Sequence, residues 1–153
     1  MSTRCQVEVQ ATDLPWNAEM VVLYHHCDGY PTGMLPIIEA AYNFATSKGG
    51  GYSWQAGRPG KTAAFVCVAD PFGFDIESST ELHSDIEWFY SIECQNKNGG
   101  EMSEVPKWRI SVYCLGPCFS RDKPRREDLK LVATGSPKLL VKRAKKLEEA
   151  EQC

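Results

Sequence analysis

The chain has 153 residues, of which 42% are hydrophobic and 24% charged, values typical of one globular domain with its own core. No run approaches the roughly 18 apolar residues of a membrane span, and the N-terminus lacks the layout of a signal peptide, so we expect a cytoplasmic protein with no membrane partner. The net charge of −3 hides a split: residues 1–106 carry 5 Lys/Arg and 14 Asp/Glu, whereas residues 107–153 carry 12 and 6. This split predicts a charged partner or charge pairing within the chain.

The number of cysteines indicates whether they form disulfides. An odd number without an export signal argues against a disulfide framework and favours reduced, mostly buried thiols. The seven cysteines are Cys5, Cys27, Cys67, Cys94, Cys114, Cys118 and Cys153.

The first elements predict an antiparallel hairpin. Residues 5–11 alternate apolar and polar side chains, as a strand with one buried face does, and residues 20–26 form a second apolar, β-branched run. Residues 12–18 between them contain turn formers. The short link favours antiparallel pairing, which places His25 and His26 on opposite faces at the end of the second strand.

A helix should follow the second strand. Asp28, Gly29 and Pro31 supply turn chemistry, and residues 33–48 repeat apolar side chains at helical spacing, with Pro36 fitting the first turn. The glycine-rich residues 49–60 should form a connection.

The second half predicts another hairpin and a last helix. Residues 85–95 and 108–114 alternate strictly around a polar tip at residues 96–100, whereas residues 70–84 should be irregular. Beyond residue 114 the chain is basic and mostly non-regular until a helix over about residues 135–151. That helix has a basic first half and an acidic second half, which oppose the helix dipole, so it should dock on another element or fray.

The resulting order, ββααββα, predicts an α+β fold: an antiparallel four-stranded sheet with helices packed on one face. Residues 1–120 would form the core. Residues 121–153 would be a basic C-terminal extension that ends in a helix and belongs to the same domain.

Three segments carry a resemblance to a known family: MSTRC at residues 1–5, YHHCDGYPTG at residues 24–33 and DIEWFYSI at residues 85–92. They resemble small, mostly uncharacterised proteins of bacteria and their phages, which open with an MSTR-like start and carry a Y-x-H-x-DGYP element. The resemblance extends to about Cys114 and implies a phage or mobile-element setting without a known reaction. It also favours a helix over residues 61–69, where propensity does not separate a buried strand from a short helix.

Two stretches have the composition of sites. The GRPGKT sequence at residues 57–62 is similar to a phosphate-binding loop, but Gln55 stands where that loop needs a glycine. Backbone amides there, with Arg58 and Lys61, could still hold a phosphate at a helix start. Trp54 beside them is either a core plug or a stacking residue for a base or a partner protein.

The second stretch is residues 25–28, whose side chains are all metal-ligand types. Adjacent strand residues point to opposite faces, so at most two could serve one ion, and we expect neither metal nor cofactor. The preferred interpretation is that the histidines and Asp28 form hydrogen bonds that fix the turn, with Tyr30 and Pro31 packed against it. A nucleophilic Cys27 with a histidine base would need a third, orienting residue, which the sequence does not identify, so we assign no catalytic residue.

Three functional hypotheses follow. The first is a phage-type binding protein that inhibits a host nucleic-acid-processing defence complex, in the manner of an anti-CRISPR protein, by protein–protein contact. In that hypothesis the acidic region between Asp70 and Glu104 occupies a positive groove meant for nucleic acid. The acidic binding candidates are Glu81, Asp85, Glu87 and Glu93.

The second hypothesis is a binder or hydrolase of a nucleotide-like ligand, and the third is direct nucleic-acid binding through the basic tail. The small-ligand candidates are His25, His26, Asp28, Tyr30, Trp54, Arg58 and Lys61. The nucleic-acid candidates are Arg121, Arg125, Arg126, Lys142 and Arg143.

Overall fold

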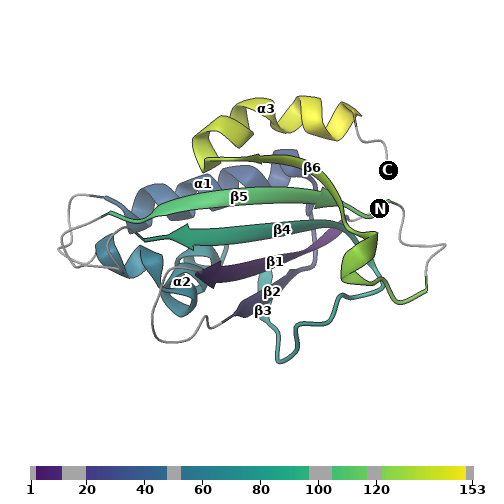
Figure 1. The fold of residues 1–153 in the computed structure, drawn as a ribbon, viewed down its shortest axis with the longest axis horizontal. Coiled ribbons are helices and arrows are strands. Elements are labelled where there is room, and N and C mark those ends of the chain that lie inside the picture. Colours follow the sequence, from purple (N-terminus) through teal and green to yellow (C-terminus); the bar gives the residue numbers. More distant parts are fainter. Residues whose placement is uncertain (1–2, 12–19, 48–52, 97–104, 117–121, 151–153) are drawn as a thin grey trace.

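The structure is a computed structural model that describes residues 3–11, 20–47, 53–96, 105–116 and 122–150. Its centre is one six-stranded mixed sheet with the strand order β3-β2-β1-β4-β5-β6, which runs from bottom to top in Figure 1. The strands are β1 (Arg4–Ala11), β2 (Val21–His25), β3 (Phe74–Ile76), β4 (Ile86–Gln95), β5 (Lys107–Cys114) and β6 (Lys130–Gly135). The helices are α1 (Pro31–Ala45), α2 (Pro59–Ala69) and α3 (Pro137–Ala150), with short 3₁₀ helices η1 (Ser53–Gly57) and η4 (Arg126–Asp128).

The predicted α+β class holds, but the predicted antiparallel four-stranded sheet is wrong. β1 pairs antiparallel with β2 and parallel with β4, so the two expected hairpins are joined through β1 and β4 into one mixed sheet. Two further strands, β3 and β6, lie at the two edges in segments that were expected to be irregular. Both edge strands are short and contain a single buried residue, Ala133, so they lack the alternation that marks a half-buried strand.

Alternation along the central strands divides the side chains between two faces. The helix-covered face carries the main core, which includes Val7, Val9, Tyr90, Ile92 and Ile110 from the sheet. The other face carries a smaller cluster of Tyr24, Leu82, Ile86 and Phe89. Ile86 was expected on the same face as Trp88, but the register between β1 and β4 shifts there, which moves Ile86 to the smaller cluster.

In Figure 1, α1 and α2 lie behind the sheet, and α3 lies above its upper edge, in contact with α1. α1 begins at Pro31 rather than residue 33, so Pro36 lies inside the helix instead of in its first turn. α2 confirms the helix that the resemblance favoured over residues 61–69. The predicted turn at residues 12–18 and residues 97–100 of the predicted hairpin tip lie outside the described residues.

The last helix docks on the core, which is one of the two outcomes expected from its opposed dipole. Pro137, Leu140, Ala144 and Leu147 of α3 are buried in the main core. Near its C-terminal end, the Glu148 carboxylate accepts a hydrogen bond of 2.6 Å from the Thr32 hydroxyl and one of 3.3 Å from the Thr32 backbone N–H. Negative charge near a helix N-terminus is stabilising, and here Glu148 of α3 supplies it to α1.

The cysteines differ from the expectation at one position. Cys5, Cys27, Cys67 and Cys94 are free, but Cys114 is disulfide-bonded, with its partner outside the described residues. The prediction that the thiols are all free is therefore wrong at Cys114. Burial raises the pKa of the Cys94 thiol to about 12 and also raises that of Cys5, so both remain neutral thiols near neutral pH.

Candidate functional site

The end of β2 is a junction of strand, tight turn and helix. Asp28 has a positive φ of 53°, which turns the chain from β2 toward α1. Gly29 then packs so closely that a Cβ there would lie 2.8 Å from the backbone of Arg4 and Cys5. The Gly29 N–H donates to the Thr3 carbonyl at 2.9 Å, and the Tyr90 hydroxyl donates to the Gly29 carbonyl at 2.8 Å. Residues 3–5 and Tyr90 thus fix this turn from two other parts of the chain.

Asp28 contributes to the turn differently from the expectation. Its carboxylate accepts a 2.9 Å hydrogen bond from the hydroxyl of Tyr30, a residue that was expected to pack against the turn. This hydrogen bond is the largest cause that raises the pKa of Tyr30. Both side chains are at the surface, so they are available to a ligand but are not held by a buried network.

A cavity of about 360 Å³ opens at this junction, between β2, the start of α1 and the turn after α2. His25 is its most buried polar side chain, with 4% of the side chain exposed, and its Nε2 lies 2.8 Å from the Asp70 carboxylate. His25 Nδ1 is buried and has no hydrogen-bond partner. Cys27, which is exposed, and Phe72 also line this cavity, which we call the β2-end cavity.

Asp70 is the carboxylate partner of His25, and the sequence did not identify it. It lies 45 residues from His25, and no local spacing connects the two. Gly73 completes the contact, since a Cβ there would overlap both His25 Nε2 and the Asp70 carboxylate. The described residues contain no group of three or more His, Cys, Asp or Glu side chains that could hold a metal ion.

His26 lies on the opposite face from His25, as the strand geometry predicts. Its Nε2 lies 2.6 Å from Asp75 of β3, and its ring meets the Tyr24 ring edge-on at 4.7 Å. Tyr24 also packs against His83, with ring centroids 4.5 Å apart. The Tyr24 hydroxyl donates to Asp85 at 2.8 Å; burial, followed by this hydrogen bond, raises the Tyr24 pKa. All three histidines of the chain are therefore paired with carboxylates beside β2 and β3.

We expect the thiols to differ in reactivity according to burial. Cys27 is exposed, whereas Cys5 and Cys94 are buried with raised pKa values, so alkylation of the native protein at pH 8 should modify Cys27 well before these two. Timed iodoacetamide labelling followed by peptide mass spectrometry measures the order. Labelling in urea, which exposes all three thiols, is the control. Equal rates at Cys27 and Cys94 in the native protein would contradict the burial of Cys94.

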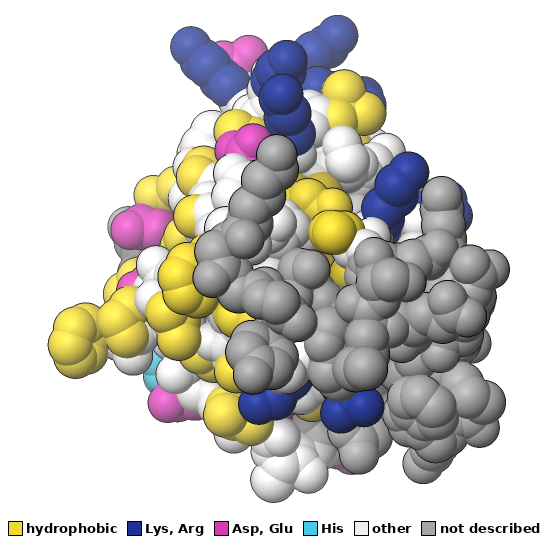
Figure 2. Space-filling model, turned by 90° about the vertical axis from the view of Figure 1, so that its left-hand side faces the viewer, with side chains coloured by type: hydrophobic (Ala, Val, Ile, Leu, Met, Phe, Trp, Pro, Cys, Tyr) yellow, Lys and Arg dark blue, Asp and Glu magenta, His cyan; other side chains and the backbone are white. Residues whose placement is uncertain are grey.

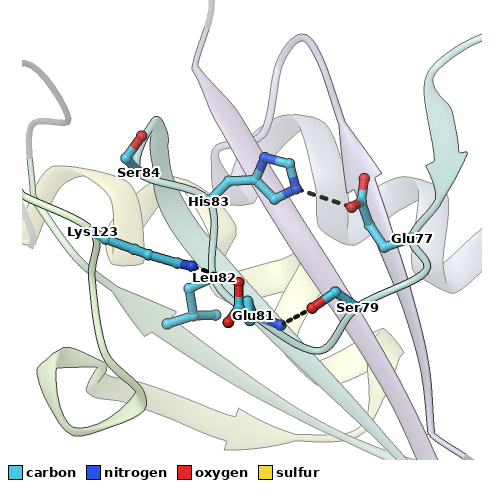
Figure 3. A pocket seen from close by; sticks show the side chains of 7 residues that line it. All are labelled: Glu77, Ser79, Glu81, Leu82, His83, Ser84 and Lys123. Atoms are coloured by element: carbon cyan, nitrogen blue, oxygen red, sulfur yellow. Dashed lines mark hydrogen bonds and ion pairs between the residues drawn. The ribbon is translucent and has the colours of Figure 1, made fainter.

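A polar groove lies on the sheet face opposite the main core. Two adjoining hollows of about 490 and 530 Å³ share Glu81, Leu82 and Lys123, so they form one groove between residues 77–84 and residues 123–126. Figure 3 shows Lys123 reaching across to Glu81 and His83 turned toward Glu77. These pairs measure 2.5 and 3.0 Å, and the bond from Lys123 lowers the pKa of Glu81. Lys123 and Glu81 therefore pair across the groove.

Arg126 belongs to the same groove and has a structural role. Its guanidinium pairs with Glu8 of β1, whose side chain is 5% exposed, and donates to the Thr80 carbonyl at 3.1 Å. It also lies 5.7 Å from the centre of the Phe89 ring. Of the other nucleic-acid candidates, Arg125 pairs with Glu127 at 3.3 Å, Lys142 and Arg143 are exposed on α3, and Arg121 lies outside the described residues.

The acidic candidates are also engaged within the chain. Glu81 pairs with Lys123, and Asp85 pairs with Arg4 at 3.1 Å besides accepting from Tyr24. Glu87 and Glu93 are half-buried on β4, and each takes part in an interaction. Much of the acidic charge thus serves to hold the segment after α2 against β1, β2 and the C-terminal residues.

The glycine-rich candidates lie around η1 and the start of α2. Trp54 belongs to η1, and its side chain is outside the description; Arg58 and Lys61 are exposed at the α2 N-terminus. The Trp108 indole and the Thr62 hydroxyl both donate to the Ala56 carbonyl, at 2.7 and 2.8 Å. Asn96 donates to the Gly57 carbonyl at 3.1 Å. These bonds to the carbonyls of residues 56 and 57 fix η1 to the core.

One surface feature was missed by the sequence analysis altogether. Four large apolar side chains are exposed on α1, α2, the turn after α2 and β3: Phe44 (61%), Val68 (62%), Phe72 (98%) and Ile76 (73%). We call them the apolar patch. Figure 2 shows hydrophobic side chains gathered along the left side of the view, one of them protruding. Sequence periodicity could not reveal the patch, because it does not distinguish a covered apolar side chain from an exposed one.

The comparisons with known proteins gave no match to a family model, a curated protein or a solved structure. Among the described helices, none combines the length and the apolar character needed to cross a membrane.

Proposed function

We propose that the protein acts by binding another protein, and that its partner is a host nucleic-acid-processing defence complex, which it inhibits in the host cytoplasm. The observation that carries the binding role is the apolar patch. Exposed apolar patches on a folded domain are typical of protein–protein interaction sites, because burying them contributes roughly 25 cal/mol per Å². The choice of partner rests on the resemblance to phage proteins.

The form of the patch supports a protein partner. Phe72 projects from the turn that follows α2, almost entirely in solvent, which is the geometry of an anchor side chain that fills a pocket on a partner. Asp70 and Asp75 flank it and add negative charge at the rim, which favours a partner with a positive surface. A machine that holds nucleic acid has such surfaces.

The test is a pulldown from nuclease-treated host lysate, read by mass spectrometry, with the wild type and the double variant Phe72→Ser/Ile76→Ser. Because both side chains are exposed, unfolding free energy should change by less than about 1 kcal/mol, whereas recovery of the partner should fall at least about tenfold. The matched control is Leu131→Ser/Leu139→Ser, which removes two half-exposed leucines from β6 and α3. Equal recovery with both variants would overturn the role of the patch.

A second candidate is the small-ligand site, favoured by the β2-end cavity. A buried imidazole with one unpartnered nitrogen, held by Asp70 and beside an exposed thiol, is a plausible contact set for a nucleotide-like ligand or for its hydrolysis. Thermal shifts across a nucleotide panel distinguish the candidates, since a ligand in this cavity raises the melting temperature without any partner protein.

A further inference from the structure

α3 carries a cluster of exposed positive charge. Five exposed cations lie along it: Lys138, Lys142, Arg143, Lys145 and Lys146. Within the part of the chain that the structure describes, Lys145 alone among them has an ion pair, a 3.8 Å contact with Glu149 in which both side chains are largely exposed. Figure 2 shows Lys and Arg side chains crowded at the top of the view, where Figure 1 places α3. We call these five residues the basic face.

The contrast with the other described cations is informative. Arg4, Lys123, Arg125 and Arg126 each pair with a carboxylate, and those pairs tie segments of the chain together. Charge pairing within the chain therefore accounts for these four cations but not for the basic face of α3. Five exposed cations on one side of a rigid helix concentrate positive potential there, despite the net charge of −3.

The fold restricts which anionic partner fits the basic face. An amphipathic basic helix binds a membrane by inserting its apolar side. In α3 that side, formed by Leu140, Ala144 and Leu147, is already buried in the core. On the exposed side of α3, Leu139 is the large apolar side chain that lies among the cations, and it is only half-exposed. The geometry therefore favours a partner that is recognised by charge at the surface of the helix.

The side chains also indicate how such a partner would be recognised. Lys138, Lys142 and Lys146 recur every fourth residue, which places them about 6 Å apart along one side of the helix. The exposed side of α3 has neither an aromatic side chain for stacking on bases nor an Asn or Gln for reading base edges. The lysine and arginine side chains on this side of α3 are suited to contact phosphates, and such contacts position a protein on nucleic acid without specifying a sequence.

We propose that the basic face of α3 binds the phosphate backbone of double-stranded nucleic acid without sequence preference. This surface lies on a different element from the apolar patch, so the two could be used at the same time. Binding through it does not require the partner protein proposed above, and either proposal can fail without the other.

The experiment measures fluorescence anisotropy of a labelled 20-base-pair DNA duplex of arbitrary sequence, titrated with the full chain at 50 to 200 mM salt. The basic-face variant is Lys138→Gln/Lys142→Gln/Lys146→Gln, since glutamine keeps the helix propensity of lysine. Its matched control, Lys61→Gln/Lys107→Gln/Arg125→Gln, also removes three exposed positive charges, but from α2, β5 and the groove.

We expect wild-type binding to weaken steeply as salt rises, with a slope of log K against log salt that becomes shallower by about one unit for each α3 contact removed. The basic-face variant should bind at least about tenfold more weakly at 50 mM salt than the matched control. Circular dichroism and melting of each variant verify the fold.

Two results would overturn the proposal. One is equal weakening by the two triple variants, which would show that net charge alone is responsible. The other is wild-type binding that is absent or insensitive to salt, a measurement that does not depend on any variant. Vesicles of phosphatidylcholine with phosphatidylserine test the other polyanion: binding to vesicles without binding to the duplex assigns the basic face to a membrane surface.

Discussion

Replacing Trp108 with alanine should lower the free energy of unfolding by about 3 to 5 kcal/mol, the range for truncating a large buried aromatic residue. Trp108 is buried between the sheet and the helix layer, and its ring packs against Tyr42 with centroids 5.1 Å apart. Its indole N–H also holds the Ala56 carbonyl at 2.7 Å. The substitution therefore leaves a cavity and releases η1 from β5, and urea unfolding followed by circular dichroism measures the loss.

The variant Trp108→Phe separates these two effects. Phenylalanine keeps part of the ring packing but cannot donate a hydrogen bond, while the Ala56 carbonyl still accepts from Thr62 at 2.8 Å. The carbonyl is thus not left without a partner, and the loss should be about 1 to 2 kcal/mol. A loss at Trp108→Phe as large as at Trp108→Ala would show that the hydrogen bond, rather than the packed ring, holds η1 in place.

Replacing Arg126 with methionine should lower the free energy of unfolding by about 2 to 3 kcal/mol at pH 7. The change removes the cation that pairs with Glu8 on the sheet face opposite the main core. The Glu8 side chain is 5% exposed, so its charge would stay buried without a partner. Because 46% of the Arg126 side chain is exposed, water can reach the site, and we expect less than the full loss for a deeply buried pair.

The double variant Glu8→Gln/Arg126→Met tests the mechanism. Removing both charges should recover most of the stability lost in Arg126→Met, because an uncompensated carboxylate is then no longer buried. The comparison uses urea midpoints of the wild type, the two single variants and the double variant. If the double variant is no more stable than Arg126→Met, the loss comes from the packing of Arg126 on Phe89 and not from its charge.

The sequence predicted the strands in which apolar and polar residues alternate. Apolar and polar side chains alternate along residues 5–11, 85–95 and 108–114, because the two faces of each strand meet different surroundings. β3 and β6 are exposed at the sheet edges, so no such alternation exists in them. The parallel pairing of β1 with β4 depends on contacts between distant segments, which hydrophobic periodicity does not report.

In the candidate site, too, the sequence predicted local geometry but not the contacts between distant segments. The opposite orientations of His25 and His26 follow from the two-residue period of a strand, and the structure places them so. Their partners, Asp70 and Asp75, come from a segment whose path could not be predicted. Likewise, the charge split of the sequence does not state which charges pair: Glu8 meets Arg126 across 118 positions, while the lysines of α3 remain available.

The position of β1 has a consequence for how the molecule assembles. β1 is made early in synthesis, yet one of its two neighbours, β4, follows only after α1, α2 and β3. Until residue 95 has emerged, the β1–β2 hairpin has an open edge that can pair with other chains. Closing so long a loop before the central contacts form also slows folding. We therefore expect the sheet around β1 to be completed late in folding and in one concerted step.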